Sequence, residues 1–188
     1  MKPSEDLMQE HKAIMIMLDI MAVISENINN KKGFEVVEIE KIVDFLKTFA
    51  DKCHHGKEEK VLFPALVAAG IPEENGPVGV MLYEHGIGRG FIKEIEHGIK
   101  RFKSGISDSD DLIAGAMLKY VDLLRNHIVK ENKYLFPTAD KVLSAPKQDK
   151  ISAQFEKIEE EVIGHGIHEK YHELLKEMQI RYTGKKDL

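Results

Sequence analysis

The stretch KCHHGKEEKVLFPAL, residues 52–66, decides the fold, and it has a second copy, RNHIVKENKYLFPTA, at residues 125–139. Both copies share the pattern His-x-x-x-Glu-x-x-x-Leu-Phe-Pro. A histidine and a glutamate four residues apart lie one above the other on the same face of an α-helix. Each copy therefore predicts a helix that presents an imidazole and a carboxylate side by side.

Apolar residues at three- and four-residue spacing predict long helices around the two copies. The predicted helices cover about 5–30, about 35–69, about 77–104, and the segment that follows the capping residues SDSDD at 107–111. Short loops rich in Gly, Pro and polar residues separate them. This order predicts an all-α fold, an antiparallel up-and-down four-helix bundle with a core over about residues 5–144. After the linker SAPKQDK we expect an additional C-terminal helix over about 149–182, within a single domain of residues 1–188.

The other two long helices each carry a histidine in the apolar stripe, and both follow a glutamate, in the Glu-His pairs at 10–11 and 84–85. An ionised carboxylate in a protein core is very costly unless it is neutralised. Two cations would neutralise both glutamates and bind the inward imidazoles. The predicted metal ligands are His11, His54, Glu58, His85, His127 and Glu131. Imidazole and carboxylate ligands without cysteine favour iron, with zinc or manganese as substitutes.

With these residues the chain resembles the hemerythrin-like family, also called the HHE cation-binding domain, over residues 5–140. The stretches CHHGKEE, GPVGVMLYEHGIGRGFIKEI and GHGIHEKYHELL also look like bacterial and archaeal members. The resemblance implies two iron ions in a non-haem di-iron centre, bridged by the two glutamates and an oxo or hydroxo ligand. It also implies a small ligand such as O2, NO or peroxide, bound or converted in sensing, scavenging or iron handling.

Two positions differ from the oxygen-carrying members of the family that the chain resembles. Arg89 stands one turn after His85, where those members have a second histidine, and a guanidinium has no free lone pair for a metal. Glu131 follows its histidine by four residues, where those members have an aspartate after five. His55 or His168 can fill the missing imidazole position. Otherwise water fills it, and we expect rapid oxidation in air instead of reversible oxygen carriage.

His55 has a second interpretation, because it lies about 100° around an α-helix from His54 and would then be exposed. In the C-terminal segment, His165 with Glu169 forms a further His-x-x-x-Glu pair, but without Leu-Phe-Pro. Tyr120 and Tyr134, on the predicted inner face of the fourth helix, are candidate hydrogen-bond donors to a bound oxygen ligand.

Two alternative functions stay open. EIEH at 94–97 and EKYH at 169–172 match the Glu-x-x-His motif of ferritin- or rubrerythrin-like di-iron oxidases. The other alternative is a metal-independent helical interaction module. Metal content separates this module from both metal proteins, and replacing His54 separates the two metal proteins.

The composition and charge of the chain indicate which classes of partner to expect. The net charge of −5 and the pI near 6.0 give no reason to expect nucleic acid or an anionic membrane. No apolar run approaches the roughly 20 residues of a membrane span. The single cysteine, Cys53, and the absence of a signal-like N-terminus favour a cytoplasmic location. A homodimer is compatible with all of these features.

Overall fold

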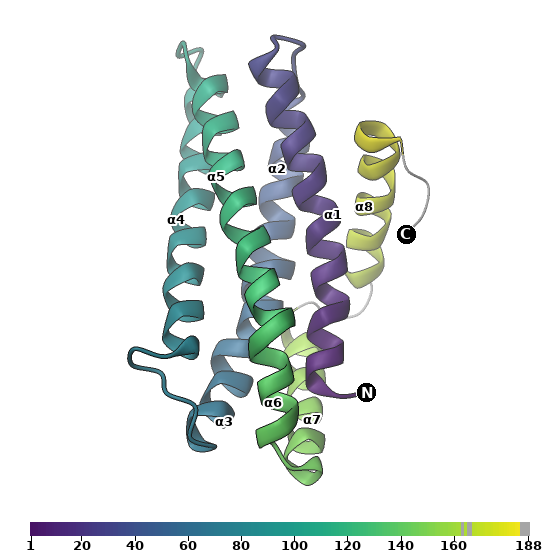
Figure 1. The fold of residues 1–188 in the computed structure, drawn as a ribbon. Coiled ribbons are helices and arrows are strands. Elements are labelled where there is room, and N and C mark those ends of the chain that lie inside the picture. Colours follow the sequence, from purple (N-terminus) through teal and green to yellow (C-terminus); the bar gives the residue numbers. More distant parts are fainter. Residues whose placement is uncertain (163, 165–166, 185–188) are drawn as a thin grey trace.

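The structure is a computed structural model that describes residues 1–162, 164 and 167–184, without the side chains of residues 167 and 168. Long helical segments run antiparallel beside one another (Figure 1), which confirms the predicted all-α bundle. Their helices are α1 (Pro3–Asn29); α2 (Val36–Phe45), η1 (Leu46–His55), η2 (Glu58–Leu62) and α3 (Phe63–Ala68); α4 (Pro77–Lys103); and α5 (Ser109–Lys130), η3 (Glu131–Leu135) and α6 (Phe136–Val142). The elements named η are π-helices, which continue the neighbouring α-helices.

The segments close into a ring around a shared interior. Helix α1 contacts α5 and η1, and α4 contacts α5 and α2. Each segment therefore turns one face inward, and a residue in the apolar stripe of any of them points toward the same interior.

Two apolar clusters fill that interior, and they are separated along the bundle. On α1, Leu7 belongs to one cluster and Ile14 to the other. On α4, Met81 and Ile92 are divided in the same way. Histidines at the predicted ligand positions of both helices lie between these apolar residues. A polar layer therefore crosses the core between two apolar ends.

Both copies of the repeated motif depart from α-helical geometry at the same place. The Phe63 N–H donates to the Glu58 carbonyl, and the Phe136 N–H donates to the Glu131 carbonyl. This five-residue spacing defines a π-helix. A proline follows each phenylalanine, and a proline such as Pro64 can neither donate a backbone hydrogen bond nor fit against the carbonyl four residues earlier. Each helical segment therefore passes its proline through a wider turn and does not end there.

The C-terminal segment differs from the expected single helix over 149–182. It forms α7 (Ala145–Val162) and α8 (Ile167–Thr183). Gly164 between them has φ +67°, a left-handed conformation that suits glycine and ends the first helix. Helix α7 contacts α1, η1 and η2, and α8 lies along α1 (Figure 1). The buried apolar side chains of α8 are Tyr171, Leu175 and Met178, and they belong to the larger apolar cluster of the core.

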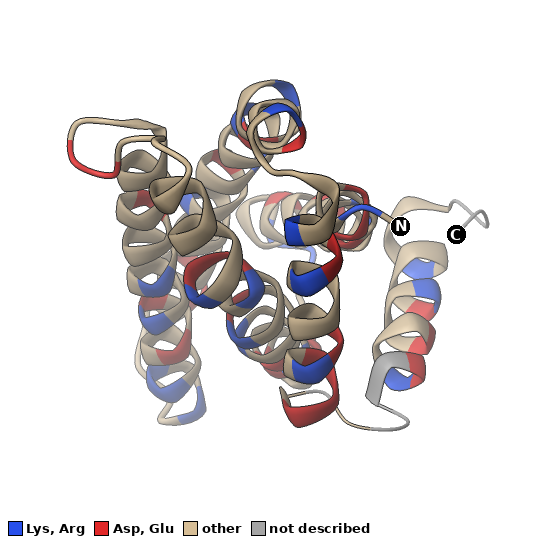
Figure 2. Ribbon diagram, turned by 90° about the horizontal axis from the view of Figure 1, so that it is seen from below, with Lys and Arg blue, Asp and Glu red and all other residues tan. Residues whose placement is uncertain are grey.

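Charged residues of both signs are interspersed around the helices, as the view in Figure 2 shows. Some of them pair across neighbouring helices, such as Lys47 with Glu96 and Lys103 with Glu40. Within the part of the chain that the structure describes, no helix combines the length and the apolarity needed to cross a membrane.

Helices α4 and α5 approach each other closely at Gly98. A Cβ atom at this position would lie 2.6 Å from Cγ1 of Ile113, whose side chain is fully buried. We expect Gly98→Ala to lower the free energy of unfolding by about 1–3 kcal/mol, the usual range for overpacking a core. Urea unfolding measures this change.

Gly90 is the matched control, because it is exposed on the same helix and its Cβ position has no atom within 4 Å. Gly90→Ala should raise the free energy of unfolding by up to about 1 kcal/mol through helix propensity alone. Equal effects of the two substitutions would contradict the close packing at Gly98.

Candidate metal centre

Five histidines and two glutamates form the polar layer, and they come from all of the long segments. None of these side chains is more than 4% exposed. The layer consists of His11 on α1; His54, His55 and Glu58 on the segment of η1 and η2; His85 on α4; and His127 and Glu131 on the segment of α5 and η3. The structure brings all six predicted residues together with His55, one of the two candidates for the missing imidazole.

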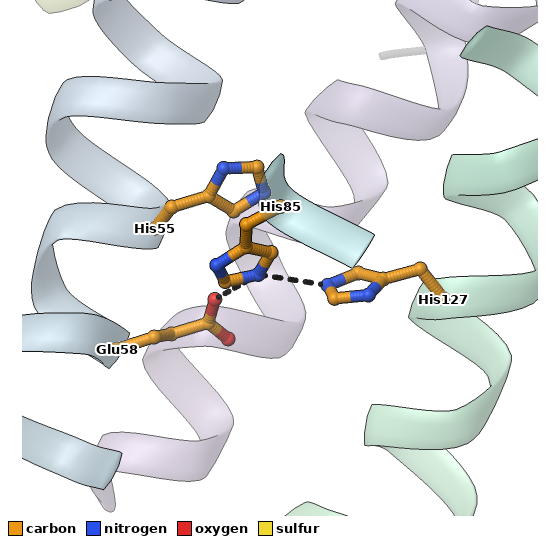
Figure 3. A group of neighbouring side chains, drawn as sticks. All are labelled: His55, Glu58, His85 and His127. Carbon is orange, nitrogen blue, oxygen red and sulfur yellow. Dashed lines mark hydrogen bonds and ion pairs between the residues drawn. The ribbon is translucent and has the colours of Figure 1, made fainter. Parts of the chain in front are cut away.

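The potential ligand atoms fall into two groups. Within each group they all lie within 4.8 Å of one another, which suits one metal ion per group. The first group contains His55, Glu58, His85 and His127 (Figure 3), and the second contains His11, His54, Glu58 and Glu131. Glu58 belongs to both groups.

Each of the two carboxylates faces one imidazole of the first group and one imidazole of the second group. The carboxylate oxygens of Glu58 lie 3.8 Å from Nε2 of His54 and 3.5 Å from Nε2 of His85. Those of Glu131 lie 3.1 Å from Nε2 of His11 and 3.3 Å from Nε2 of His127. Each glutamate thus directs its two oxygens toward different groups. This is the arrangement in which a carboxylate can be shared by two cations.

His55 is buried, so the α-helical expectation of an exposed side chain is wrong. It lies at the end of the π-helix η1, whose turn holds more residues than an α-helical turn, so that successive side chains are closer in angle. His54 and His55 therefore both point inward. The ring of His55 stacks on that of His85 with centroids 3.8 Å apart (Figure 3).

Arg89 lies outside the layer and binds two carboxylates there. Its Nη2 is 2.7 Å from Asp51 Oδ1 and 2.8 Å from Glu59 Oε1. Those same carboxylate oxygens accept from Nδ1 of His55 and His85. Arg89 thus binds the carboxylates that anchor His55 and His85. The histidine missing at position 89 is replaced in the layer by His55.

Every imidazole of the layer has an acceptor at Nδ1. Because an ionised carboxylate and an amide oxygen can only accept, Nδ1 carries the proton and Nε2 turns its lone pair inward. The acceptors and distances are Glu10 for His54 (2.7 Å), Asp51 for His55 (3.3 Å), Glu59 for His85 (2.7 Å), Glu84 for His127 (2.9 Å) and the side-chain oxygen of Asn132 for His11 (2.8 Å).

None of these anchors was assigned from the sequence. A signal for two of them was present in the repeated Glu-His pairs. Glu10 and Glu84 are the glutamates of these pairs, and each anchors the histidine of a His-x-x-x-Glu copy on another helix, His54 or His127.

The inward atoms of the layer are incompletely satisfied. Among the described residues, no hydrogen-bond partner exists for Nε2 of His11 and His55 or for either carboxylate oxygen of Glu58 and Glu131. An unsatisfied buried polar group costs about 1–3 kcal/mol, and more when it is charged. Bound cations would satisfy these atoms. The mixed imidazole and carboxylate donors fit iron, manganese or zinc.

The charges of the layer are strongly coupled. Burial and the charge of Glu131 raise the pKa of Glu58 well above its ordinary value. Burial opposes protonation of His127, but the negative charges of Glu131 and Glu84 and the hydrogen bond to Glu84 raise the pKa of His127 to about 9. Nε2 of His85 lies 3.1 Å from Nε2 of His127, so a proton or a cation is needed between these two lone pairs. Without metal, the layer therefore retains protons.

The remaining sequence candidates lie outside the layer. His97 and His172 are exposed, so the two Glu-x-x-His motifs do not meet in the core, and the ferritin-like alternative is wrong. Tyr134 is 68% exposed, because the π-helix η3 shifts the face that it occupies. Tyr120 is buried, and its hydroxyl has no hydrogen-bond partner among the described residues.

Two histidines of the C-terminal segment cannot be placed. His165 and the side chain of His168 lie outside what the structure describes. The role considered for His168 as a replacement ligand is not needed to complete the layer, since His55 lies there.

Comparison with known proteins agrees with this geometry. Residues 2–139 match the family model described as the hemerythrin HHE cation-binding domain. The comparison with curated proteins gives no match. The matched region contains every residue of the polar layer and ends before α7. The chain belongs to the hemerythrin HHE cation-binding domain family.

Proposed function

We propose that the chain binds two iron ions in the polar layer and that this centre binds or reacts with a small ligand such as O2, NO or peroxide. Sensing, scavenging or iron handling are the roles such a centre serves. The observation that supports the proposal most is the placement of Glu58 and Glu131. Each faces imidazoles of both groups, and their four oxygens have no hydrogen-bond partner among the described residues.

The proposed ligands divide unequally between the two ions. His55, His85 and His127 would hold one ion and His11 and His54 the other, with the carboxylates of Glu58 and Glu131 lying between them. Iron supplies redox chemistry and an attachment point for a small ligand.

The enclosure of the layer supports a small ligand. Its side chains are at most 4% exposed, and apolar clusters lie on either side. A larger substrate could reach the donor atoms only if the bundle opened. Tyr120 stays a candidate hydrogen-bond donor to the small ligand.

The expectation of rapid oxidation in air rested on a missing imidazole. With His55 in the layer, the donor set has five imidazoles and that reason no longer holds. The proposed function therefore includes both reversible binding of the small ligand and reaction with it, and the experiment on the small ligand below separates the two.

Iron content tests the proposed ligands. Protein loaded with ferrous iron under exclusion of oxygen should retain about two irons per chain after desalting. His85→Ala and Glu58→Gln should each lose at least one iron, because each removes a donor. His97→Ala is the matched control, since His97 is exposed on the same helix as His85, and it should retain both irons. A folded wild-type protein that stays free of iron would contradict the proposal.

The small ligand is tested on the same loaded protein. Adding O2, NO or peroxide separately should change its optical spectrum, and removing O2 afterwards should show whether that change is reversible. His97→Ala should respond as the wild type does. A fully loaded protein whose spectrum responds to none of the three would contradict a small-ligand function while leaving metal binding intact.

Metal binding should release protons. The pKa of His127 is raised to about 9, so at pH 7 the metal-free protein carries a proton there that a metal ion must displace. For each proton displaced, the apparent affinity for metal should rise about tenfold per pH unit and level off above about pH 9. Calorimetric titration with zinc in two buffers of different ionisation enthalpy counts these protons. A zinc affinity that does not change between pH 6 and pH 8 would refute this coupling.

A further inference from the structure

The repeat places a lysine three residues after the first histidine of each copy. In the first copy, Lys57 Nζ lies 2.7 Å from Glu10 Oε1, and the other oxygen of Glu10 is 2.7 Å from Nδ1 of His54. The lysine and the histidine therefore share one carboxylate.

The second copy repeats this arrangement. Lys130 donates to Glu84, and the other oxygen of Glu84 is 2.9 Å from Nδ1 of His127. Two equivalent chains of lysine, glutamate and histidine thus lead from the outside of the bundle to the polar layer.

The C-terminal extension makes the two lysines unequal. Lys130 is 37% exposed, whereas Lys57 is fully buried beneath α7. Nζ of Lys57 lies 3.1 Å from Glu159 Oε2 and 5.6 Å from the ring centre of Phe155, both on α7. It also lies 3.0 Å from Asp6 Oδ2. Among the described residues, α7 therefore reaches Lys57 and leaves Lys130 partly exposed.

Burial strengthens the effect of this contact. Charges interact more strongly in the protein interior than at an exposed and screened site. A lysine that pulls on Glu10 weakens this carboxylate as an acceptor for the His54 Nδ1–H. A weaker acceptor at Nδ1 makes Nε2 a weaker metal donor. Glu159 draws Lys57 away from Glu10 and thus acts in the opposite direction.

We propose that α7 adjusts one half of the metal centre through Lys57. Lys57 is a positioning residue that sets the donor strength of His54 through Glu10, and Glu159 sets how strongly Lys57 acts. His127 serves as the internal comparison, because Lys130, the lysine of its chain, is not buried under α7. The inference rests on the proposed function, because His54 must bind a metal for its donor strength to matter.

The Nδ1 proton resonance of His54 in the zinc-loaded protein tests this inference, because a stronger hydrogen bond moves it downfield. Lys57→Met frees Glu10 for His54 and should shift the resonance downfield. Glu159→Gln removes the carboxylate that competes for Lys57, so Lys57 should bind Glu10 more strongly and the His54 resonance should shift upfield. The resonance of His127 should stay in place in both variants. Opposite shifts at one histidine are not expected from a general loosening of the structure.

Two controls complete the design. Glu160→Gln, at an exposed position beside Glu159, should move neither resonance, and Lys130→Met should move His127 downfield and leave His54 in place. Glu159 is 39% exposed, so its variant carries the test even if Lys57→Met does not fold. Zinc-loaded variants in which the His54 resonance stays in place, or moves together with that of His127, overturn the inference and leave the proposed function standing. A wild-type protein that binds no zinc or iron overturns both.

Discussion

Two carboxylates buried in an apolar bundle are the constraint on which the rest of this structure depends. Glu58 and Glu131 are fully buried, and neither has a lysine or arginine in the layer to neutralise it. Burying an ionised group without compensation costs far more than a single domain can spare. The layer compensates with imidazoles whose lone pairs point inward. This is a donor set for cations, and bound cations would remove the cost.

The internal repeat builds this layer from two halves and then makes them unequal. Each half supplies a Glu-His pair, a His-x-x-x-Glu pair and a lysine, and each anchors one histidine of the other half. The equivalence fails where His55 corresponds to Ile128 and where Glu59 corresponds to Asn132. One group therefore has three imidazoles, all with carboxylate anchors, and the other has two. Helix α7 adds a further difference by covering Lys57 alone.

Much of this arrangement follows from α-helical periodicity, which is why the sequence predicts it. The apolar stripes predict the bundle, and the four-residue spacing predicts that His54 and Glu58 share a face. His55 escapes this reasoning because it lies at the end of a π-helix, where the angle between successive side chains is smaller. The exposure of Tyr134 has the same origin. Local geometry that departs from the assumed period cannot be predicted from that period.

Contacts between residues on different helices are harder to predict from the sequence than which residues share one face of a helix. The anchors of the imidazoles lie mostly on other helices, so spacing along the chain does not reveal them, although the repeated Glu-His pairs hinted at two. The break at Gly164 was overlooked because a glycine within a periodic segment is compatible with a continuing helix.

The free energy of unfolding, measured with and without bound metal, tests most directly whether cations neutralise the buried layer. A ligand that binds only the folded state stabilises it by about 4 kcal/mol when present at a thousand times its dissociation constant. We predict that removing metal with a chelator lowers the free energy of unfolding by at least this amount, and that restoring ferrous iron without oxygen recovers it. Equal free energies for the metal-free and the iron-treated protein would contradict a layer that depends on cations.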